Sequence, residues 1–480
     1  AGSNDYIDSN AVVFHVQDSR NNVTSIQISQ NTIQDIPYAG SSLTASTSTA
    51  FNFKILELNN TSGNDSVYFE FLSNEIKELK LSGAFVGCNS EKNSFLNLSK
   101  NKFHDIESYT GTSYGYNLQS NQGLLINDNI FKKSKYSINS TNYAWIIYLR
   151  NNTQAKGKVI EINRNQIDSN KATYLGSISI FGQSDYDIIG NKITHNRITS
   201  TDWNSFTGIY TIRCGNLNVI SNLIANNISN GMMLTWYSEN TSSSLYTYNA
   251  YYNTIVFNDS GLSTFDQYVS FFYDQSELNF VGNVIQAKGT ASAYMNYILN
   301  PGTVKDNNIW SEGKFSNEYW QLGNNSYNKF SDWYADSKSD KSNHNQSPRF
   351  RDEKAGDYRS GQVLNQNNTK ATTFSTTDVL GTKRSQIMHD RGAIESYFDL
   401  GFRIDYTASI DTVCSGYIFD PTVWVVNNFS DTVSTLKIGY FVNGKHYSES
   451  FSQSVPAGDS VKLNFSKPIQ INTPEKWANH

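Results

Sequence analysis

A short motif, apolar-x-apolar-x-x-Asn-x-apolar, recurs through the first 310 residues of this 480-residue chain and limits the folds open to it. IQISQNTI begins at Ile26 and LNLSKNKF begins at Leu96, with the asparagine at the same offset in both. Successive copies lie 24 to 43 residues apart, a period typical of chains that stack repeated units. The asparagines of the ten copies are Asn31, Asn74, Asn101, Asn129, Asn165, Asn191, Asn222, Asn253, Asn283 and Asn307.

The alternation before each asparagine predicts a strand, and the asparagine itself predicts a bend. Residues two apart in a strand share a face, so Ile26 and Ile28 point the same way. Asparagine tolerates a left-handed backbone, and its amide can bond to the same residue in a neighbouring copy. We therefore expect a buried structural ladder at the turn between two short strands, formed by Asn74, Asn101, Asn129, Asn165, Asn191, Asn222, Asn253 and Asn283.

Composition favours an all-β, extracellular protein. Aromatic residues make up 14% of the chain and charged residues only 17%, and strand-favouring aromatics argue against helices. The formal net charge of -5 offers no basic stripe for nucleic acid. No apolar run approaches the roughly 18 residues of a membrane helix, so direct membrane insertion is not expected. The three cysteines and seven histidines show no metal-ligand spacing, and no metal is predicted.

A second set of strand-like runs lies between the asparagine motifs. Examples are WIIYLRNN at 145–152, GIYTIRCG at 208–215 and VSFFYDQ at 269–275. Stacked in parallel, these runs would form one sheet whose outer face carries aromatic and amide side chains, suited to stacking on sugar rings and bonding to hydroxyls. The in/out register is not fixed by the sequence. The carbohydrate-binding candidates are Tyr148, Trp236, Tyr237 and Tyr273.

The asparagine ladder resembles that of the right-handed parallel β-helix proteins of the pectate-lyase-like superfamily. A later region, NQSPRFRDEKAGDY at 345–358, TTDVLGTKRS at 376–385 and DRGAIES at 390–396, resembles the closing segment of secreted β-helix proteins of Bacteroidetes-type bacteria. The resemblance implies β-helix coils over residues 1–310, a closing segment over 311–398, and a secreted or cell-surface bacterial location. It is specific for architecture and weak for activity, since one fold hosts many functions.

The pattern of residues changes near residue 400. Short alternating runs separated by Asn-Asn, Asn-Gly and Pro-Ala-Gly turns predict an antiparallel β-sandwich over residues 399–480. VWVVNNFSDTV, IGYFVNGK and VPAGDSVKLNF resemble the immunoglobulin-like CARDB modules that follow β-helices in such bacteria. The expected last strands are missing, so we expect this module to be incomplete and the chain to belong to a longer polypeptide or a larger assembly.

A leucine-rich repeat is the rival architecture, because its strand and turn follow the same motif. Against it, the later copies lack the leucine-spaced helical half, and the period often exceeds that family's 20 to 29 residues. The rival also leaves the second set of strand-like runs unexplained.

Catalytic motifs of related β-helices are not found. No Asn-Thr-Asp, Asp-Asp or Gly-His-Gly occurs, so the paired carboxylates of a hydrolase are missing. Arg150 and Arg213 are weak candidates for the basic residue of a lyase, and calcium enters only under that alternative. Four Asp-Ser/Thr-Val triplets resemble a Bacteroidetes O-glycosylation signal and place glycosylation candidates at Ser66, Thr412, Thr432 and Ser460.

The sequence therefore predicts an extracellular structural or adhesive module that contacts carbohydrate or other surface proteins, without a cofactor. The alternative is a polysaccharide lyase or glycoside hydrolase that acts on an acidic polysaccharide along the sheet face. Clustered carboxylates would favour the enzyme, whereas a face of aromatic and amide groups would favour the module. Whether the chain is an enzyme is left open, with the balance toward a non-catalytic role.

Overall fold

The fold is given by a computed structural model. It describes residues 10–17, 25–34, 52–59, 68–81, 83–93, 95–136, 142–155, 159–199, 206–229, 233–237, 246–259, 267–273, 276–289, 292–312, 315, 318–336, 343–360, 377–384, 390–395, 400–403, 417–419, 422–427, 432–442, 445–456, 459–466 and 469–471. These residues are nearly all in strands and turns, and the chain divides into two compact units. The first unit holds residues 1–364 with 378–382 and 391–394, and the second holds the remainder.

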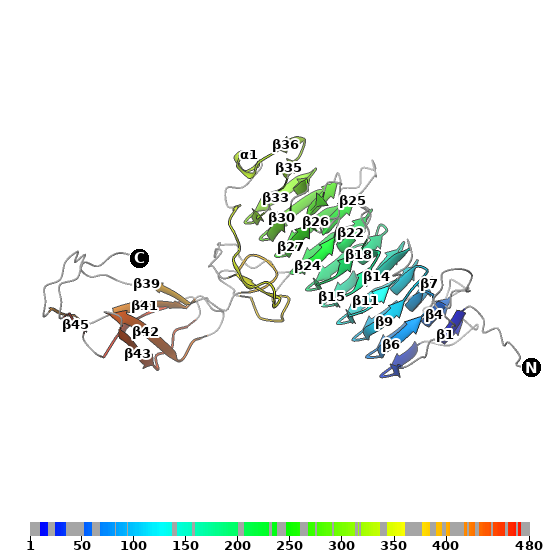
Figure 1. Ribbon diagram of the computed structural model, residues 1–480, viewed down its shortest axis with the longest axis horizontal. Coiled ribbons are helices and arrows are strands. Elements are labelled where there is room, and N and C mark those ends of the chain that lie inside the picture. The colour runs from blue at the N-terminus through cyan, green and yellow to red at the C-terminus, as the bar shows by residue number, and fades with distance from the viewer. Residues whose placement is uncertain are drawn as a thin grey trace, which may run out of the picture. The chain divides into compact units, whose positions relative to one another are not determined.

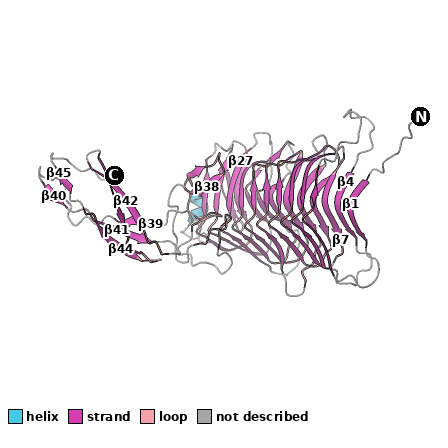
Figure 2. Ribbon diagram, turned by 90° about the horizontal axis from the view of Figure 1, so that it is seen from below, coloured by secondary structure: helices cyan, strands magenta, loops and turns pink. Residues whose placement is uncertain are grey.

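Three parallel sheets make up most of the first unit (Figure 1). The chain passes through them in turn, so that each round adds one rung to every sheet, and we call one round a coil. Figure 2 shows these rungs stacked one behind another. The described residues contain only one helix, α1 (Phe330–Ala335), so the helical half of a leucine-rich repeat is not seen there. None of their helices has the length and apolarity that a membrane crossing requires.

Sheet A contains the second set of strand-like runs. Its strands are β1 (Asn10–Gln17), β4 (Asn52–Asn59), β7 (Phe85–Glu91), β10 (Ser113–Gln119), β14 (Tyr143–Arg150), β18 (Tyr174–Phe181), β22 (Phe206–Ile212), β25 (Leu234–Tyr237), β28 (Gln267–Tyr268), β29 (Ser270–Tyr273), β32 (Ala293–Ile298), β35 (Glu318–Leu322) and the antiparallel β36 (Asn325–Tyr327).

Sheets B and C contain the strands before and after each motif asparagine. Sheet B has β2 (Ser25–Ser29), β5 (Tyr68–Leu72), β8 (Phe95–Ser99), β11 (Leu124–Asn127), β15 (Ile160–Asn163), β19 (Tyr186–Ile189), β23 (Leu217–Ile220), β26 (Thr247–Tyr251), β30 (Glu277–Val281) and β33 (Pro301–Lys305). Sheet C has β3 (Thr32–Ile33), β6 (Glu75–Leu81), β9 (Lys102–Ser108), β12 (Ile130–Lys132), β13 (Lys135–Tyr136), β16 (Gln166–Asp168), β17 (Lys171–Ala172), β20 (Lys192–Thr194), β21 (Arg197–Ile198), β24 (Leu223–Ser229), β27 (Thr254–Asp259), β31 (Val284–Lys288) and β34 (Asn308–Ser311).

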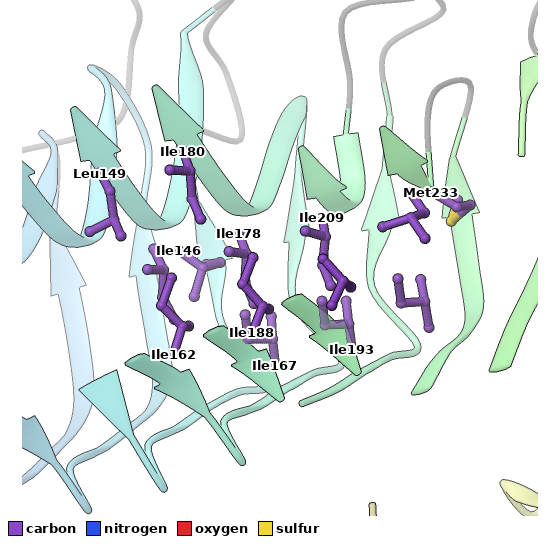
Figure 3. Packing of buried hydrophobic residues seen from close by; sticks show 14 of the residues in the cluster. Ile146, Leu149, Ile162, Ile167, Ile178, Ile180, Ile188, Ile193, Ile209 and Met233 are labelled. Atoms are coloured by element: carbon purple, nitrogen blue, oxygen red, sulfur yellow. The ribbon is translucent and has the colours of Figure 1, made fainter. Parts of the chain in front are cut away.

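Aliphatic side chains from all three sheets fill the space inside the coils. In one coil Ile178, Ile188 and Ile193 come from β18, β19 and β20 and point into the same interior (Figure 3). Each core position is repeated in the next coil, because parallel register places equivalent residues side by side. The column Ile167, Ile193, Ile224, Ile255 and Ile285 is buried along its whole length. Burial of this apolar surface is the main term that stabilises the stack.

The motif asparagines stack into a continuous ladder at the turn from sheet B to sheet C. In each link, one asparagine donates its backbone N–H and its side-chain Nδ2 to the Oδ1 of the next, as Asn165 does to Asn191 at 2.9 and 3.0 Å. The remaining Nδ2 proton goes to a backbone carbonyl, such as that of Ile126 at 2.7 Å. The predicted asparagines from Asn74 to Asn283 are buried, and the ladder extends beyond them to Asn31 at one end and Asn343 at the other.

The backbone at this turn corrects one sequence-based expectation. The asparagine does not adopt the left-handed conformation; the residue before it does. The asparagine instead must direct both its N–H and its amide toward the next coil, and the preceding residue takes the positive φ that makes the bend. The residues with positive φ are Gln30, Ser73, Lys100, Asp128, Arg164, Gly190, Ser221, Tyr252, Gly282 and Asp306.

Two further ladders were not predicted. One lies after sheet A and links Asn93, Asn121 and Asn152. The other lies within sheet C and links Ser134, Asn170, Asn196 and Asn227. The second of these had a usable signal, because its members follow the motif asparagines Asn129, Asn165, Asn191 and Asn222 by five residues.

The closing segment contacts the last coils on the outer face of sheet C. Leu223, Ala225 and Val256 point outward there and are covered by Tyr358 and Ile394, among others. The Gly392 N–H donates to the Gly282 carbonyl at 2.7 Å, and the backbone of Gly392 has a φ of 87°. A Cβ at Gly392 would lie 2.4 Å from the Thr254 hydroxyl, so this position of the DRGAIES motif requires glycine.

The second unit contains short antiparallel pairings. A three-stranded sheet joins β39 (Leu400–Arg403), β41 (Thr422–Asn427) and β44 (Ser460–Asn464), and β42 (Leu436–Val442) pairs with β43 (Lys445–Phe451). β40 (Tyr417–Phe419) pairs with β45 (Ile469–Ile471), while β37 (Phe350–Asp352) and β38 (Asp357–Ser360) form a small hairpin in the first unit. A buried apolar cluster lies within the second unit and contains Val423, Val425, Leu436, Val455, Leu463 and Phe465.

Candidate functional site

The outer face of sheet A carries a concentration of aromatic side chains. Parallel register sets its outward side chains in columns, one side chain per coil. One column runs Tyr148, Ser179, Tyr210, Thr235, Phe271 and Tyr297, and its neighbour runs Arg150, Phe181, Ile212, Tyr237 and Tyr273. We call the seven aromatic members of the two columns the aromatic strip.

The rings of the aromatic strip support one another in two groups. The Tyr148 ring lies 5.4 Å from that of Phe181, which lies 5.8 Å from that of Tyr210. Farther along, Tyr237 stacks on Tyr273 at 5.5 Å. These distances suit favourable aromatic pairing, which restricts the rings before any ligand arrives.

Exposure differs along the strip, and this decides which rings are accessible. Tyr273 is 39% exposed, whereas Tyr148 and Tyr237 are half-buried. Burial raises the pKa of Tyr297 above the usual tyrosine value. Its phenol, like that of an ordinary tyrosine, is protonated at neutral pH and can donate a hydrogen bond.

Trp236 is a correction to the predicted carbohydrate contacts. It is only 2% exposed and points into the coil, where it packs against Phe272 and Tyr248. The reason is the alternation of β25: Tyr237 faces outward, so its neighbour Trp236 must face inward. An indole in the core cannot stack on a sugar.

An open hollow of about 600 Å³ lies where sheet A ends and its turns begin. Phe181 of the aromatic strip lines it, and both predicted arginines, Arg150 and Arg213, lie on it. The two arginines are exposed: Arg150 is the last residue of β14 and Arg213 follows the end of β22, two coils on, which is roughly 10 Å at the spacing of adjacent strands. The hollow thus joins aromatic surface to two guanidinium groups.

The backbone around the hollow is held by the turns between coils. Asn151 and Arg213 both have positive φ, and the Gly182 N–H donates to the Ile212 carbonyl at 3.1 Å. Asn152 and Ser184 lie beneath, where the Ser184 hydroxyl donates to the Asn152 carbonyl at 2.6 Å. These bonds between neighbouring coils therefore fix the backbone positions of Arg150 and Arg213.

The chemistry of the hollow is that of a binding surface. Its lining residues are Arg150, Asn151, Asn152, Thr153, Phe181, Gly182, Gln183, Ser184, Ile212 and Arg213. This lining supplies guanidinium, amide and hydroxyl groups and contains no carboxylate or imidazole. Within the described part of the chain, no three histidine, cysteine, aspartate or glutamate side chains are grouped as metal ligands.

A polar row on the outer face of sheet B was missed by the sequence analysis. The Nδ2 of Asn218 donates to Asp187 at 2.7 Å, Asn249 donates to Asn218 at 2.8 Å, and Asn279 donates to Asn249 at 3.0 Å. These side chains are half-buried and one coil apart. The signal was present in four consecutive motifs, from YDIIGNKI to LNFVGNVI, where D or N at the second position precedes the inner apolar residue.

The four predicted glycosylation sites have different placements. Ser66 and Thr412 lie outside the described residues. Thr432 is exposed just before the strand-like Val433, and Ser460 is exposed at the start of β44.

Comparison of the chain with protein families, with curated proteins and with solved structures found no match.

Proposed function

We propose that this chain is a structural or adhesive module of a bacterial surface or secreted protein, and that it contacts carbohydrate through the outer face of sheet A. The observation that carries the proposal is the aromatic strip, which leads into a hollow bordered by Arg150 and Arg213. Other surface proteins are the second kind of partner that such a face suits. No cofactor is part of the proposal.

The aromatic strip supplies affinity in a form suited to sugars. The C–H face of a sugar ring can cover the apolar face of a tyrosine ring. Each 100 Å² of apolar surface removed from water in this way contributes about 2.5 kcal/mol of favourable free energy. Tyr148, Tyr237 and Tyr273 also carry hydroxyls that can bond to the sugar's hydroxyls. Because neighbouring rings already restrict these side chains, less conformational entropy is lost on binding.

The arginines extend the same surface toward anionic saccharides. A guanidinium presents its donors in a planar fork that matches a carboxylate. With Arg150 and Arg213 two coils apart, a saccharide chain lying along the stack would meet both. Acidic polysaccharides are therefore included in the proposed ligand class.

The architecture is proposed to be that of a right-handed parallel β-helix similar to the pectate-lyase-like superfamily, followed by an immunoglobulin-like sandwich. The three parallel sheets and the asparagine ladder support the first part, and the antiparallel pairings with their own apolar cluster support the second. Thr432 and Ser460 are exposed and remain candidates for O-glycosylation.

Replacing the tyrosines of the strip by alanine should weaken carbohydrate binding. We expect Tyr148→Ala, Tyr237→Ala and Tyr273→Ala each to reduce affinity by about tenfold, because covering about 60 Å² of ring surface contributes about 1.5 kcal/mol, and a tenfold change is about 1.4 kcal/mol. The measurement is calorimetric titration with the tightest ligand from a panel of neutral and uronate-containing oligosaccharides. The matched control is Tyr68→Ala, which removes an exposed tyrosine from sheet B. Equal losses in the control and the strip variants would refute the proposal.

A polysaccharide lyase is the second candidate function. It is favoured by one observation, that the two candidate basic residues Arg150 and Arg213 line a single hollow. We expect no turnover of pectin, alginate or chondroitin with or without calcium. Unsaturated products that absorb in the ultraviolet, lost on Arg150→Ala or Arg213→Ala, would select the lyase instead.

A further inference from the structure

The outer face of sheet C carries a column of cations that none of the preceding functions uses. Register aligns Lys135 with Lys171 and Lys171 with Arg197 in consecutive coils. The same column continues through Ile228 and Asn258 to Lys288. We call Lys135, Lys171, Arg197 and Lys288 the basic column.

The two ends of the basic column are bound to carboxylates of the chain. Lys135 Nζ lies 2.6 Å from Glu107 Oε1, its neighbour in the preceding coil. Lys288 Nζ lies 2.8 Å from Glu353 Oε2 and 3.1 Å from Glu312 Oε2. Each end cation therefore has an anionic partner at hydrogen-bond distance.

Lys171 and Arg197, in the middle of the column, are different. They are exposed neighbours of like charge, and no carboxylate of the described residues forms an ion pair with either. Asp168, three residues before Lys171 in the chain, already accepts from Thr194 at 2.7 Å and bonds to His195 at 2.9 Å. Like charges in directly opposite positions of a sheet repel, so an anion between them would relieve this repulsion.

The surrounding face is basic in a chain that is acidic overall. From β6 to β21, the strands and turns of sheet C carry nine lysine or arginine and five aspartate or glutamate side chains. The whole chain has a formal net charge of -5. Such an asymmetry attracts anionic partners to one face.

The chain itself shows how this face binds a carboxylate. Over the last coils, the closing segment lies on the outer face of sheet C, and Glu353 provides the contact to the basic column. Its backbone carbonyl also accepts from Asn226 Nδ2 at 2.8 Å. The closing segment reaches the coil of Arg197 at Gly356, which lies beside His195, but within the described residues no hydrogen bond or ion pair joins the segment to Lys171 or Arg197.

We propose that Lys171 and Arg197 bind the acidic groups of a linear anionic polysaccharide that lies along sheet C. Carboxylate and sulfate groups would both satisfy the pair, since each accepts from ammonium and guanidinium donors. The outward strand residues on these coils are Gln166, Asp168, Lys192 and Thr194, none of which is aromatic. The one ring nearby in the described residues, His195, is held by hydrogen bonds to Asp168 at 2.9 Å and Asn226 at 3.2 Å, so it does not offer a free ring for stacking a nucleic-acid base. The site is separate from the aromatic strip and does not rest on the function proposed for sheet A.

The test uses the full chain with polygalacturonate as the carboxylate probe, dextran sulfate as the sulfate probe and neutral dextran as the uncharged probe. Binding is measured in an Arg150→Gln/Arg213→Gln background, so that the hollow on sheet A does not supply the signal. We expect Lys171→Gln/Arg197→Gln to weaken binding of at least one acidic polymer at least tenfold, and to leave neutral dextran unbound. Affinity for that polymer should fall steeply with added salt.

The matched control is Lys100→Gln/Lys305→Gln, which makes the same charge change on the turn and strand of sheet B. We expect this variant to bind the acidic polymer as the background protein does, and both variants to unfold at the same denaturant concentration. Equal weakening by the control would overturn the proposal, since only net charge would then matter. Single-stranded DNA of matched charge that binds as tightly as the acidic polymers would also overturn it.

Discussion

Replacing Asn191 by leucine should destabilise the first unit by about 3 kcal/mol or more. The substitution removes the Nδ2 bonds to Ile162 at 2.7 Å and Asn222 at 3.0 Å. It also removes the acceptor of two donors from Asn165. The groups left behind are buried, and each unsatisfied one costs about 1–3 kcal/mol. Urea denaturation followed by circular dichroism measures the change.

Asn218→Leu is the matched control for this prediction. Asn218 also bridges two coils, with bonds to Asp187 at 2.7 Å and from Asn249 at 2.8 Å, but it lies on the half-exposed outer row of sheet B. Water can replace those bonds, so we expect a loss of about 1 kcal/mol or less. Similar losses for the two variants would show that the inner ladder has no special role in stability.

Removing one partner of the buried ion pair between Arg384 and Glu395 should also have a large effect. The Nη1 of Arg384 lies 3.0 Å from Glu395 Oε2, and their side chains are 0% and 5% exposed. Arg384→Ala leaves a buried carboxylate without its cation, and breaking such a pair costs about 3–5 kcal/mol. Because the pair joins two parts of the closing segment, we expect proteolysis of this segment to accelerate, which limited digestion and mass spectrometry would detect.

The control for the ion pair is Arg359→Ala. Arg359 pairs with Asp357 in the same closing segment, but both side chains are partly exposed. Exposed pairs contribute about 0–1 kcal/mol, so digestion should change little. If Arg384→Ala were as mild as Arg359→Ala, the buried pair would not be what holds the segment.

The all-β class and the parallel stacking could be predicted from sequence because every coil is under the same structural constraints. Every coil must bury the same positions and make the same turn, so Ile28, Asn31 and Ile33 recur with equivalent neighbours at fixed offsets. The ladder asparagine is hard to replace, since it alone offers two donors and an acceptor in the space available. Such local constraints remain visible even when the loops between copies vary in length.

The candidate site could be predicted only in part, because it depends on which way each strand faces. Trp236 and Tyr237 are adjacent aromatic residues, and the sequence alone does not say which of them lies outside. A shift of one residue in register exchanges the two faces of a strand. The pairing of Lys171 with Arg197 likewise depends on the alignment of two short strands, which varies with the loop between them.

The most direct test of the central claim, that carbohydrate binds to the outer face of sheet A, is a crystal structure of the chain with its tightest-binding oligosaccharide. We expect sugar rings over Tyr148, Tyr237 or Tyr273, with any acidic group near Arg150 or Arg213. An oligosaccharide ordered only on sheet B or on the second unit, with the aromatic strip bare, would contradict it.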